Sequence, residues 1–171
     1  MYSMNYTDVI RERRSIRKYK PEADVPQEHI QMILEAAMMA PSACNTRPWE
    51  FFVTKNVEVK EALMQAQPYC KMLKTAPAAI VVCGRPDLQE GKCNDYWPQD
   101  CGAAIENILL QAKALGYGSC WCGCYPVMDR VTAIQEILHT ESIPVAIVAI
   151  GVADEEPTAR GFFDPERVTY L

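Results

Sequence analysis

Apolar residues recur at helical spacing in five stretches of the chain, and each stretch predicts an amphipathic helix. The clearest covers residues 26–40, where Ile30, Ile33 and Ala37 fall on one face. Pro26 suits the first turn of such a helix, and the Pro-Ser pair after residue 40 ends it. The other predicted helices cover residues 7–14, 57–66, 99–115 and 127–138.

Four shorter apolar runs predict the strands of one sheet. Residues 78–83 form an almost unbroken apolar run, which is typical of a central strand covered on both faces. The other predicted strands cover residues 50–54, 119–123 and 144–151. This order of helices and strands predicts an α+β or mixed α/β domain, with helices packed on a single sheet.

We expect residues 1–171 to form a single domain, because no repeat, low-complexity tract or linker interrupts the sequence. The predicted helix over residues 99–115 is apolar around much of its circumference, which indicates burial in a core or an interface. The C-terminal tail, residues 155–171, is instead rich in charge and proline. We therefore expect the tail to lie on another surface.

Composition narrows the class of protein. The 171 residues are 49% hydrophobic and 23% charged, with a net charge of −5, so no broad surface for nucleic acid is expected. No apolar run approaches the roughly 20 residues that cross a bilayer, and the first residues lack the pattern of a secretory signal. We expect a cytoplasmic protein that binds neither membrane nor nucleic acid, with its eight cysteines as reduced thiols.

The candidate chemistry begins with an arginine segment, residues 13–17, in which Arg13, Arg14 and Arg17 surround Ser15. Guanidinium forks match phosphate oxygens, and a serine hydroxyl supplies a further donor. Together with the uncommon residues 41–49, this segment predicts a site for a small phosphorylated ligand with a flat apolar body. The chain has no Gly-x-Gly-x-x-Gly turn and no Gly-Lys-Ser/Thr loop, so standard dinucleotide and nucleoside-triphosphate folds are not expected.

Closely spaced cysteines at residues 120, 122 and 124 raise the alternative of a metal or redox-thiol site. Strand alternation places Cys120 and Cys122 on one face, but two thiols do not make a four-ligand cage. His29 and His139 lie in helical patterns without ligand spacing. We expect no metal site, and we interpret most of the cysteines as small buried apolar residues.

Three segments of the sequence are similar to those of a known family. Residues 13–17, Arg-Arg-Ser-Ile-Arg, resemble the Arg-Arg-Ser-x-Arg opening of the nitroreductase family of flavoproteins. Residues 41–49, Pro-Ser-Ala-Cys-Asn-Thr-Arg-Pro-Trp, resemble its Pro-Ser-x-x-Asn-x-Gln-Pro-Trp segment. Residues 100–107 and 115–123 are similar to its central helix and the strand that follows. The matches occur in the family's order and span nearly the whole chain.

The resemblance implies a mostly antiparallel central sheet flanked by helices, in an interlocked homodimer that holds FMN at its interface. The tail over residues 155–171 would pack on the partner subunit. The residues implied at the phosphate and ribityl chain are Arg13, Arg14, Ser15, Arg17 and Arg160. The residues implied to reach the partner's flavin are Pro41, Ser42, Ala43 and Asn45. The residues implied along the edge of the isoalloxazine ring are Cys120, Trp121, Cys122 and Gly123.

The implied activity is transfer of hydride from NADH or NADPH to the flavin, and then reduction of a nitroaromatic, quinone or flavin acceptor by a ping-pong mechanism. No protein side chain is expected to act as a catalytic residue, because the flavin carries the electrons. Trp97, Trp121 and Tyr69 are candidates to line the open face. Arg47 stands where the family has glutamine, and a cation there would favour the reduced flavin anion.

Two alternatives remain open at this point. One is a flavoenzyme with a single specific substrate, such as a dehydrogenase or a dehalogenase. The other is a flavin-binding protein for storage or redox sensing, with little turnover.

Overall fold

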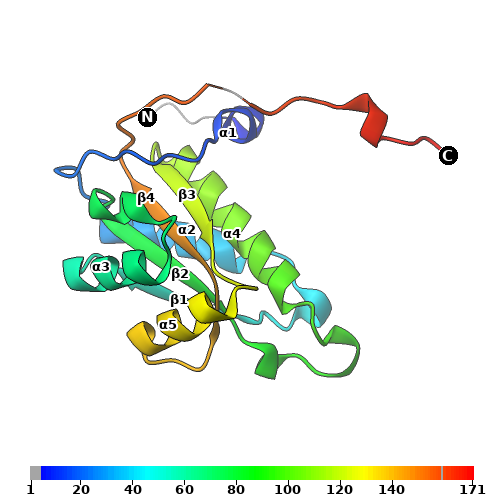
Figure 1. The fold of residues 1–171 in the computed structure, drawn as a ribbon. Helices are drawn as coiled ribbons and strands as arrows, with labels where there is room; N and C mark the ends of the chain where they lie inside the picture. Colours follow the sequence, from blue (N-terminus) through cyan, green and yellow to red (C-terminus); the bar gives the residue numbers. More distant parts are fainter. Residues whose placement is uncertain (1–4, 159) are drawn as a thin grey trace.

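A four-stranded antiparallel sheet forms the centre of the molecule in the computed structural model, which describes residues 5–158 and 160–171 (Figure 1). The strand order is β1-β2-β4-β3. The strands are β1 (Trp49–Thr54), β2 (Ala78–Gly84), β3 (Gly118–Gly123) and β4 (Ile143–Gly151). The two strands with the most continuous apolar sequence, β2 and β4, occupy the centre and are almost entirely buried. The predicted α+β class is confirmed.

Alternating side chains of the central strands divide the interior into two apolar cores. Ile80 of β2 lies opposite Val148 of β4, and both point into the core on one face of the sheet. Val81 lies opposite Ile147, and both point into the core on the other face. Continuous apolar sequence is required in these strands because both of their faces are covered.

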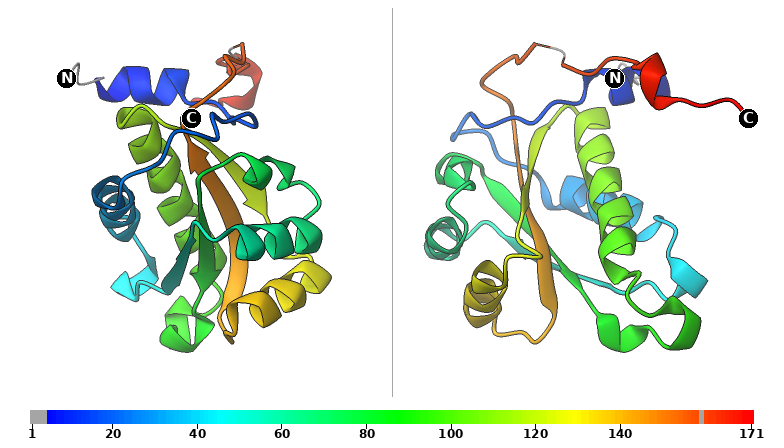
Figure 2. Two further views of the ribbon diagram at one scale, coloured as in Figure 1. Left: turned by 90° about the vertical axis from the view of Figure 1, so that its left-hand side faces the viewer. Right: turned by 45° about the vertical axis from the view of Figure 1, so that its right-hand side comes forward.

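Helices cover both faces of this sheet, as the left view of Figure 2 shows. On one face lie α2 (Gln27–Met38) and α4 (Trp97–Ala114), and the buried residues of α4 form the largest part of that core. On the other face lie α3 (Val57–Ala66), α5 (Met128–Leu138) and the short 3₁₀ helix η2 (Lys71–Lys74). All the predicted helices and strands are present, with limits within two residues of those expected.

The first helix, α1 (Tyr6–Glu12), begins at Asn5, whose Oδ1 accepts a hydrogen bond of 3.0 Å from the Asp8 amide. The chain then runs along the exposed edge of the sheet, where the Ile16 amide donates to the Ser119 carbonyl at 2.9 Å. A β-carbon at Gly118 would lie 2.7 Å from Cγ1 of Ile16, so only glycine permits this close approach.

A second glycine allows the same contact further along. At Gly151 a β-carbon would lie 2.9 Å from the ring of Tyr19, whose hydroxyl donates to the Ile16 carbonyl at 2.8 Å. The arginine segment thus lies directly on the backbone of β3, and Tyr19, just after it, lies on that of β4.

Beyond β4 the tail extends away from the body of the molecule, and its described residues include one short 3₁₀ helix, Pro165–Arg167 (Figure 1). Its large apolar side chains are open, with exposed fractions of 83% for Phe162, 74% for Phe163 and 89% for Tyr170. Ala159, within the predicted tail, lies outside the described residues. Among the described helices, none has the length and apolar character needed to span a bilayer.

The expectation of eight reduced thiols is wrong at two positions. Cys44 and Cys93 form a disulfide, which joins the 3₁₀ helices η1 (Ala43–Asn45) and η4 (Gly91–Cys93). The two cysteines are 49 residues apart in the sequence, and folding of β1, α3 and β2 between them brings the two turns together. The other six cysteines are free and buried.

Candidate functional site

The arginine segment lines a cavity of about 810 Å³ at the sheet edge. We name it the arginine cavity and define it by the predicted phosphate ligands Arg13, Arg14, Ser15, Arg17 and Arg160. The first four come from the segment after α1, and Arg160 arrives from the tail. The structure therefore brings together five residues that are separated by almost the whole sequence.

The guanidiniums of this cavity differ in the partners that they already have within the chain. Nε of Arg13 lies 3.4 Å from Oε1 of Glu106 on α4, in a half-exposed ion pair. Arg14 donates to the carbonyl of Arg13 at 2.6 Å. Among the described residues, no carboxylate oxygen lies within 4.0 Å of the guanidinium nitrogens of Arg14 or Arg17. Their charge is therefore available to an anionic ligand.

One carboxylate, that of Glu155, holds the start of the tail against this segment. Its Oε1 accepts hydrogen bonds from the backbone amides of Arg17 and Lys18, the latter at 3.1 Å. The amide of Asp154 donates in turn to the Lys18 carbonyl at 2.9 Å. These contacts fix the backbone that presents Arg17 and the first residues of the tail.

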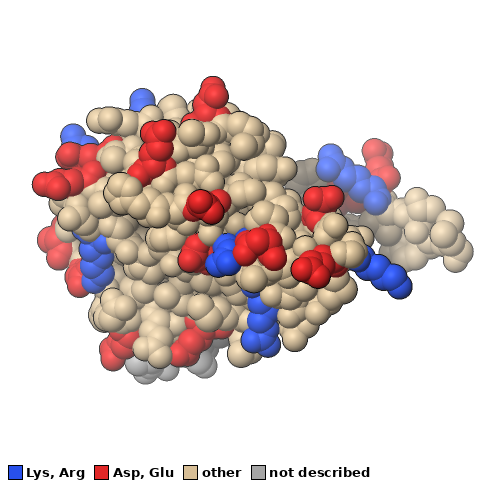
Figure 3. All heavy atoms as spheres, turned by 90° about the horizontal axis from the view of Figure 1, so that it is seen from below, with Lys and Arg blue, Asp and Glu red and all other residues tan. Residues whose placement is uncertain are grey.

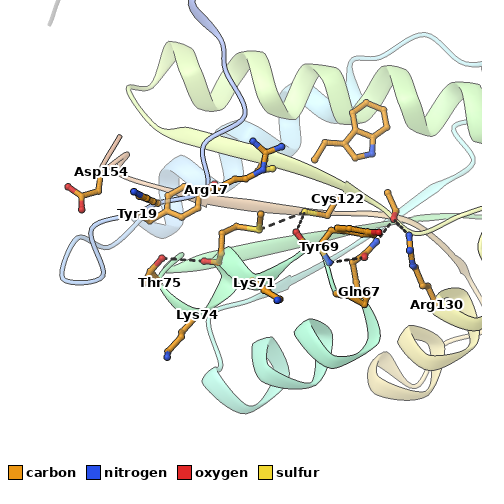
Figure 4. A pocket seen from close by; sticks show the side chains of 16 residues that line it. Arg17, Tyr19, Gln67, Tyr69, Lys71, Lys74, Thr75, Cys122, Arg130 and Asp154 are labelled. Carbon is orange, nitrogen blue, oxygen red and sulfur yellow. Dashed lines mark hydrogen bonds between the residues drawn. The ribbon is translucent and has the colours of Figure 1, made fainter. Parts of the chain in front are cut away.

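A second cavity, of about 1110 Å³, opens beside the first (Figure 4). We name it the thiol-floored cavity, because β3 contributes to it the predicted ring-edge residues Cys120, Trp121, Cys122 and Gly123. Its opposite wall is formed by residues 67–75, and Arg130 of α5 closes one end. Arg17 lines both cavities, so they meet at its side chain.

The thiols of this floor are buried and neutral. Cys120 and Cys122 belong to the same core, which confirms that they share one face of β3. A hydrogen bond with Cys122, together with burial, raises the pKa of the Cys120 thiol. The Cys122 sulfur lies 3.8 Å from the Met72 sulfur. The floor is therefore an uncharged, polarizable surface rather than a source of thiolate. In the described part of the chain, no group of three or more His, Cys, Asp or Glu side chains is placed to hold a metal ion.

The carbonyl of Gly123 is held from two sides at the end of this floor. Arg130 donates to it from α5 at 3.4 Å, and the buried side chain of Gln67 donates from the end of α3. The Gln67 Oε1 also accepts from the Tyr69 amide at 3.2 Å. This network joins β3 to the opposite wall and fixes the width of the cavity.

The loop predicted to touch the partner's flavin lies elsewhere in the chain. The Ala43 amide donates to Asp100 at the start of α4 at 3.1 Å, whereas Glu12 beside the arginine segment pairs with Lys113 at its end, 3.2 Å apart. A rise of 1.5 Å per residue makes the distance between these two points of the helix about 20 Å. None of the loop's predicted site residues lines either cavity of its own chain; they are Pro41, Ser42, Ala43 and Asn45.

The aromatic candidates separate into two groups. Tyr69 and Trp121 line the thiol-floored cavity, as expected. Trp97 does not, because it is buried against Gly84 and stacks edge-to-face on Tyr125 with ring centroids 4.8 Å apart. Sequence reasoning singled out no cation on the cavity wall besides Arg17. The pair of lysines at residues 71 and 74 was the one sequence feature that could have indicated a cationic wall, and it lies in a short segment without other clear chemistry.

The described chain thus combines an α+β fold, a cavity lined by arginines and an adjoining cavity with an uncharged floor. Sequence comparison identifies the class more closely, because a sequence model of the nitroreductase family matches residues 10–67 and 63–152. The chain belongs to the nitroreductase family of oxidoreductases, as the three motifs predicted.

Individual relatives agree with this assignment. A protein of Methanothermobacter thermautotrophicus named "Putative NADH dehydrogenase/NAD(P)H nitroreductase" is 43% identical over 96% of this chain and 86% of its own length. An FMN-dependent nitroreductase from Clostridium difficile R20291 superimposes with a TM-score of 0.86 at 34% identity, covering 96% of this chain and 98% of the other. A "putative nitroreductase in complex with fmn" from Desulfovibrio desulfuricans gives 0.86 at 26% identity, over 98% of both chains.

Proposed function

We propose that this chain is an FMN-dependent oxidoreductase that takes hydride from NADH or NADPH and reduces nitroaromatic, quinone or flavin acceptors in a ping-pong cycle. The observation that carries the proposal is the junction at Arg17, where a cationic cavity continues into one with a flat, uncharged floor. A flavin mononucleotide has the same two parts, a phosphate and a planar ring. Solved relatives described as FMN-dependent or FMN-bound support this assignment.

Each cavity has a distinct task in this proposal. Arg14 and Arg17, whose guanidiniums have no carboxylate partner among the described residues, would bind the phosphate by charge-assisted hydrogen bonds, together with Arg160 from the tail. The neutral floor at Cys120 and Cys122 would support the ring without competing for electrons. FMN, when bound, supplies the two-electron chemistry, and the protein's part is to orient the reactants.

The size of the thiol-floored cavity fits alternating substrates. Its volume of about 1110 Å³ lies above the upper end of the usual range for one small ligand, about 1,000 Å³. A ring lying on the floor would leave the outer part open for a nicotinamide and then for an acceptor. Such shared use of one open face is what a ping-pong cycle requires.

We further propose that the active species is a homodimer. Because no residue of the loop at residues 41–45 lines either cavity of its own chain, the loop would instead complete the cavity of the partner subunit. The exposed Phe162 and Phe163 support the second expectation, that the tail packs on the partner. Burial of such side chains in an interface would remove a large apolar area from water.

The first experiment is spectroscopic. Purified protein is expected to be yellow, with the absorbance of bound flavin, and to bleach when NADH or NADPH is added without air. Colour without bleaching would instead favour a storage or sensing role. Protein that neither carries FMN nor takes it up would contradict the proposed function altogether.

Arg17→Ala is expected to weaken FMN binding more than tenfold, because the phosphate would lose a charge-assisted hydrogen bond worth about 1.5–3 kcal/mol. Arg13→Ala should act in the same direction. The measurement is the dissociation constant of FMN from the apoprotein, by recovery of flavin fluorescence. Arg85→Ala is the control, because Arg85 is paired with Asp87 away from both cavities. Equal affinity in Arg17→Ala and Arg85→Ala would refute the phosphate site.

A further inference from the structure

The thiol-floored cavity collects positive charge in a chain whose net charge is −5. Its only acidic lining residue among the described residues is Asp154. Its cationic lining residues are Arg17, Lys18, Lys71, Lys74 and Arg130. The outer surface differs, since acidic side chains are spread widely over the face seen in Figure 3 and basic ones stand singly or in small groups. The proposed function uses Arg17 for the flavin phosphate, and a cation beside the ring would favour the reduced flavin anion, but neither role involves Arg130 at the Gly123 carbonyl.

Arg130 is the cation best placed to bind a further ligand. It uses one donor in a long hydrogen bond of 3.4 Å to the Gly123 carbonyl. No carboxylate among the described residues lies within 4.0 Å of it. Arg85 shows the contrast, because its guanidinium is already engaged by both oxygens of Asp87, at 2.8 and 2.6 Å. Arg130 therefore keeps donors for a planar anion.

Tyr69 gives this cation an aromatic neighbour. The Arg130 guanidinium lies 5.3 Å from the centre of the Tyr69 ring, and that residue remains 71% exposed (Figure 4). The backbone of Tyr69 is fixed on both sides, because its amide donates to Gln67 at 3.2 Å and its carbonyl accepts from the Cys122 thiol at 3.6 Å. An open aromatic ring held against an unpaired guanidinium offers a flat surface with a positive edge.

We propose that Tyr69 and Arg130 form a subsite for an aromatic acid, so that the preferred acceptors carry a carboxylate on a reducible ring. The inference rests on the proposed function, because Gly123, which Arg130 contacts, is the residue expected beside the edge of the flavin ring. An aromatic ring stacked near Tyr69 would then present its reducible group to the flavin while its carboxylate meets Arg130. Arg130 is thus a specificity residue rather than a catalytic one.

The probe reaction uses 4-nitrobenzoate and its neutral analogue 4-nitrobenzamide. NAD(P)H gives up a hydride and becomes NAD(P)⁺, one N–O bond of the nitro group breaks, and the oxygen leaves as water after taking up the hydride equivalent and one solvent proton. The product is 4-nitrosobenzoate, with nitrogen reduced by two electrons. The two acceptors differ in charge but scarcely in shape, so the ratio of their kcat/KM values reports the subsite.

We expect the holoenzyme to favour 4-nitrobenzoate over 4-nitrobenzamide about tenfold, as one charge-assisted contact allows. Arg130→Gln should bring the ratio close to one, and Arg130→Lys should restore part of it. Arg85→Gln, with a guanidinium already engaged by Asp87, is the matched control and should keep the ratio. Binding without turnover gives a second measure: benzoate should bind the holoenzyme more tightly than benzamide by calorimetry, and this difference should vanish in Arg130→Gln.

The outcomes separate failure of the subsite from failure of the proposed function. Turnover of a neutral quinone with no preference for the acid in the wild type would overturn the subsite and leave the oxidoreductase intact. A change in Arg130→Gln confined to the ratio of NADPH to NADH use would also overturn it, because the anion would then belong to the donor. Absence of turnover with every acceptor would count against the proposed function itself.

Discussion

A buried thiol ionises less readily than a thiol in the unfolded chain, and this difference acts on the stability of the fold. Cys101 of α4 is fully buried, with its sulfur 3.6 Å from the Pro48 carbonyl. Burial, with a smaller contribution from the charge of Asp100, raises the pKa of Cys101 from 9.0 to about 12. Burial likewise raises the pKa of Cys124 to about 12. Such thiols stay protonated in the native state well above pH 9.

This residue-scale effect predicts loss of stability in alkali. Between pH 9 and about 12 the unfolded chain releases the Cys101 proton and the native chain retains it, so the free energy of unfolding falls as pH rises. Each such thiol contributes a slope of about 1.4 kcal/mol per pH unit. Cys101→Ser keeps a donor near the Pro48 carbonyl but does not titrate there, so it should flatten the slope by that amount. Urea unfolding at pH 10 and pH 11, where the unfolded thiol is ionised and the native one is not, measures it, and an unchanged slope would contradict the assignment.

At the scale of the element, the loop over residues 41–48 is shaped by contacts to distant segments. Its backbone takes positive φ angles at Cys44, Asn45 and Arg47, a conformation that non-glycine residues rarely adopt. The disulfide to Cys93 ties it to η4. Asp100, in the first turn of α4, accepts from the Ala43 amide at 3.1 Å and from the buried side chain of Gln89 at 2.8 Å.

Asp100→Ala should therefore destabilise the protein by about 2 kcal/mol, because the Ala43 amide would lose its acceptor and Gln89 would keep only its hydrogen bond of 3.2 Å to the Thr46 hydroxyl. Glu106→Ala on the same helix is the comparison, since its half-exposed ion pair with Arg13 should contribute less than about 1 kcal/mol. Both values come from chemical denaturation at neutral pH. Equal losses in the two variants would show that Asp100 does not hold the loop.

At the same scale, elements that depend on local sequence are predictable, whereas those that depend on contacts between distant segments are not. The helix at residues 27–38 and the strand at 78–84 followed directly from apolar periodicity, because burial of a face requires that period. The loop conformation at Cys44 was not predictable, since it depends on residues about 50 positions later in the chain. Asparagine is enriched at positive φ, as at Asn45, but nothing in the residue type marks Cys44 or Arg47 for that conformation.

In the candidate site too, residues grouped in the sequence are predictable and residues brought together only by the fold are not. The arginine segment was found because its chemistry is concentrated in five consecutive residues. Arg130 and Gln67 were missed, because each is an ordinary polar residue of its own helix until the fold carries it to the Gly123 carbonyl. Trp97 was misplaced for the related reason that an aromatic residue in a helix has no intrinsic sign of which face it packs against.

At the scale of the whole molecule, the tail is the part that a single chain does not explain. It has no core of its own, and the phenylalanines at positions 162 and 163 lie open to solvent. Its one specific anchor to the body near its start is Glu155, at the amides of Arg17 and Lys18. We expect the rest of the tail to find its contacts on a second subunit.

The double variant Phe162→Ser/Phe163→Ser should accordingly weaken dimerisation, because it removes two large apolar side chains from the proposed interface. Sedimentation velocity should show a shift towards monomer at concentrations where the unmodified chain is dimeric, with lower FMN content. Val57→Ser, at an exposed position at the start of α3, serves as the control. An unmodified chain that sediments as a monomer while fully loaded with FMN would contradict the shared site.

The position of the arginine segment on the sheet depends on two residues without side chains, Gly118 beside Ile16 and Gly151 beside Tyr19. Ligand binding by the arginines therefore depends on these glycines as well. Neither glycine lines the arginine cavity, so a survey ranked by distance to the ligand would pass over both. Yet one added methyl at Gly118 meets Ile16, and one at Gly151 meets Pro77 and Tyr19, so either substitution would strain the contact between the sheet and the segment that carries the guanidiniums. Redesign of this protein for a new cofactor would have to treat those two bare backbone positions as fixed points of the scaffold.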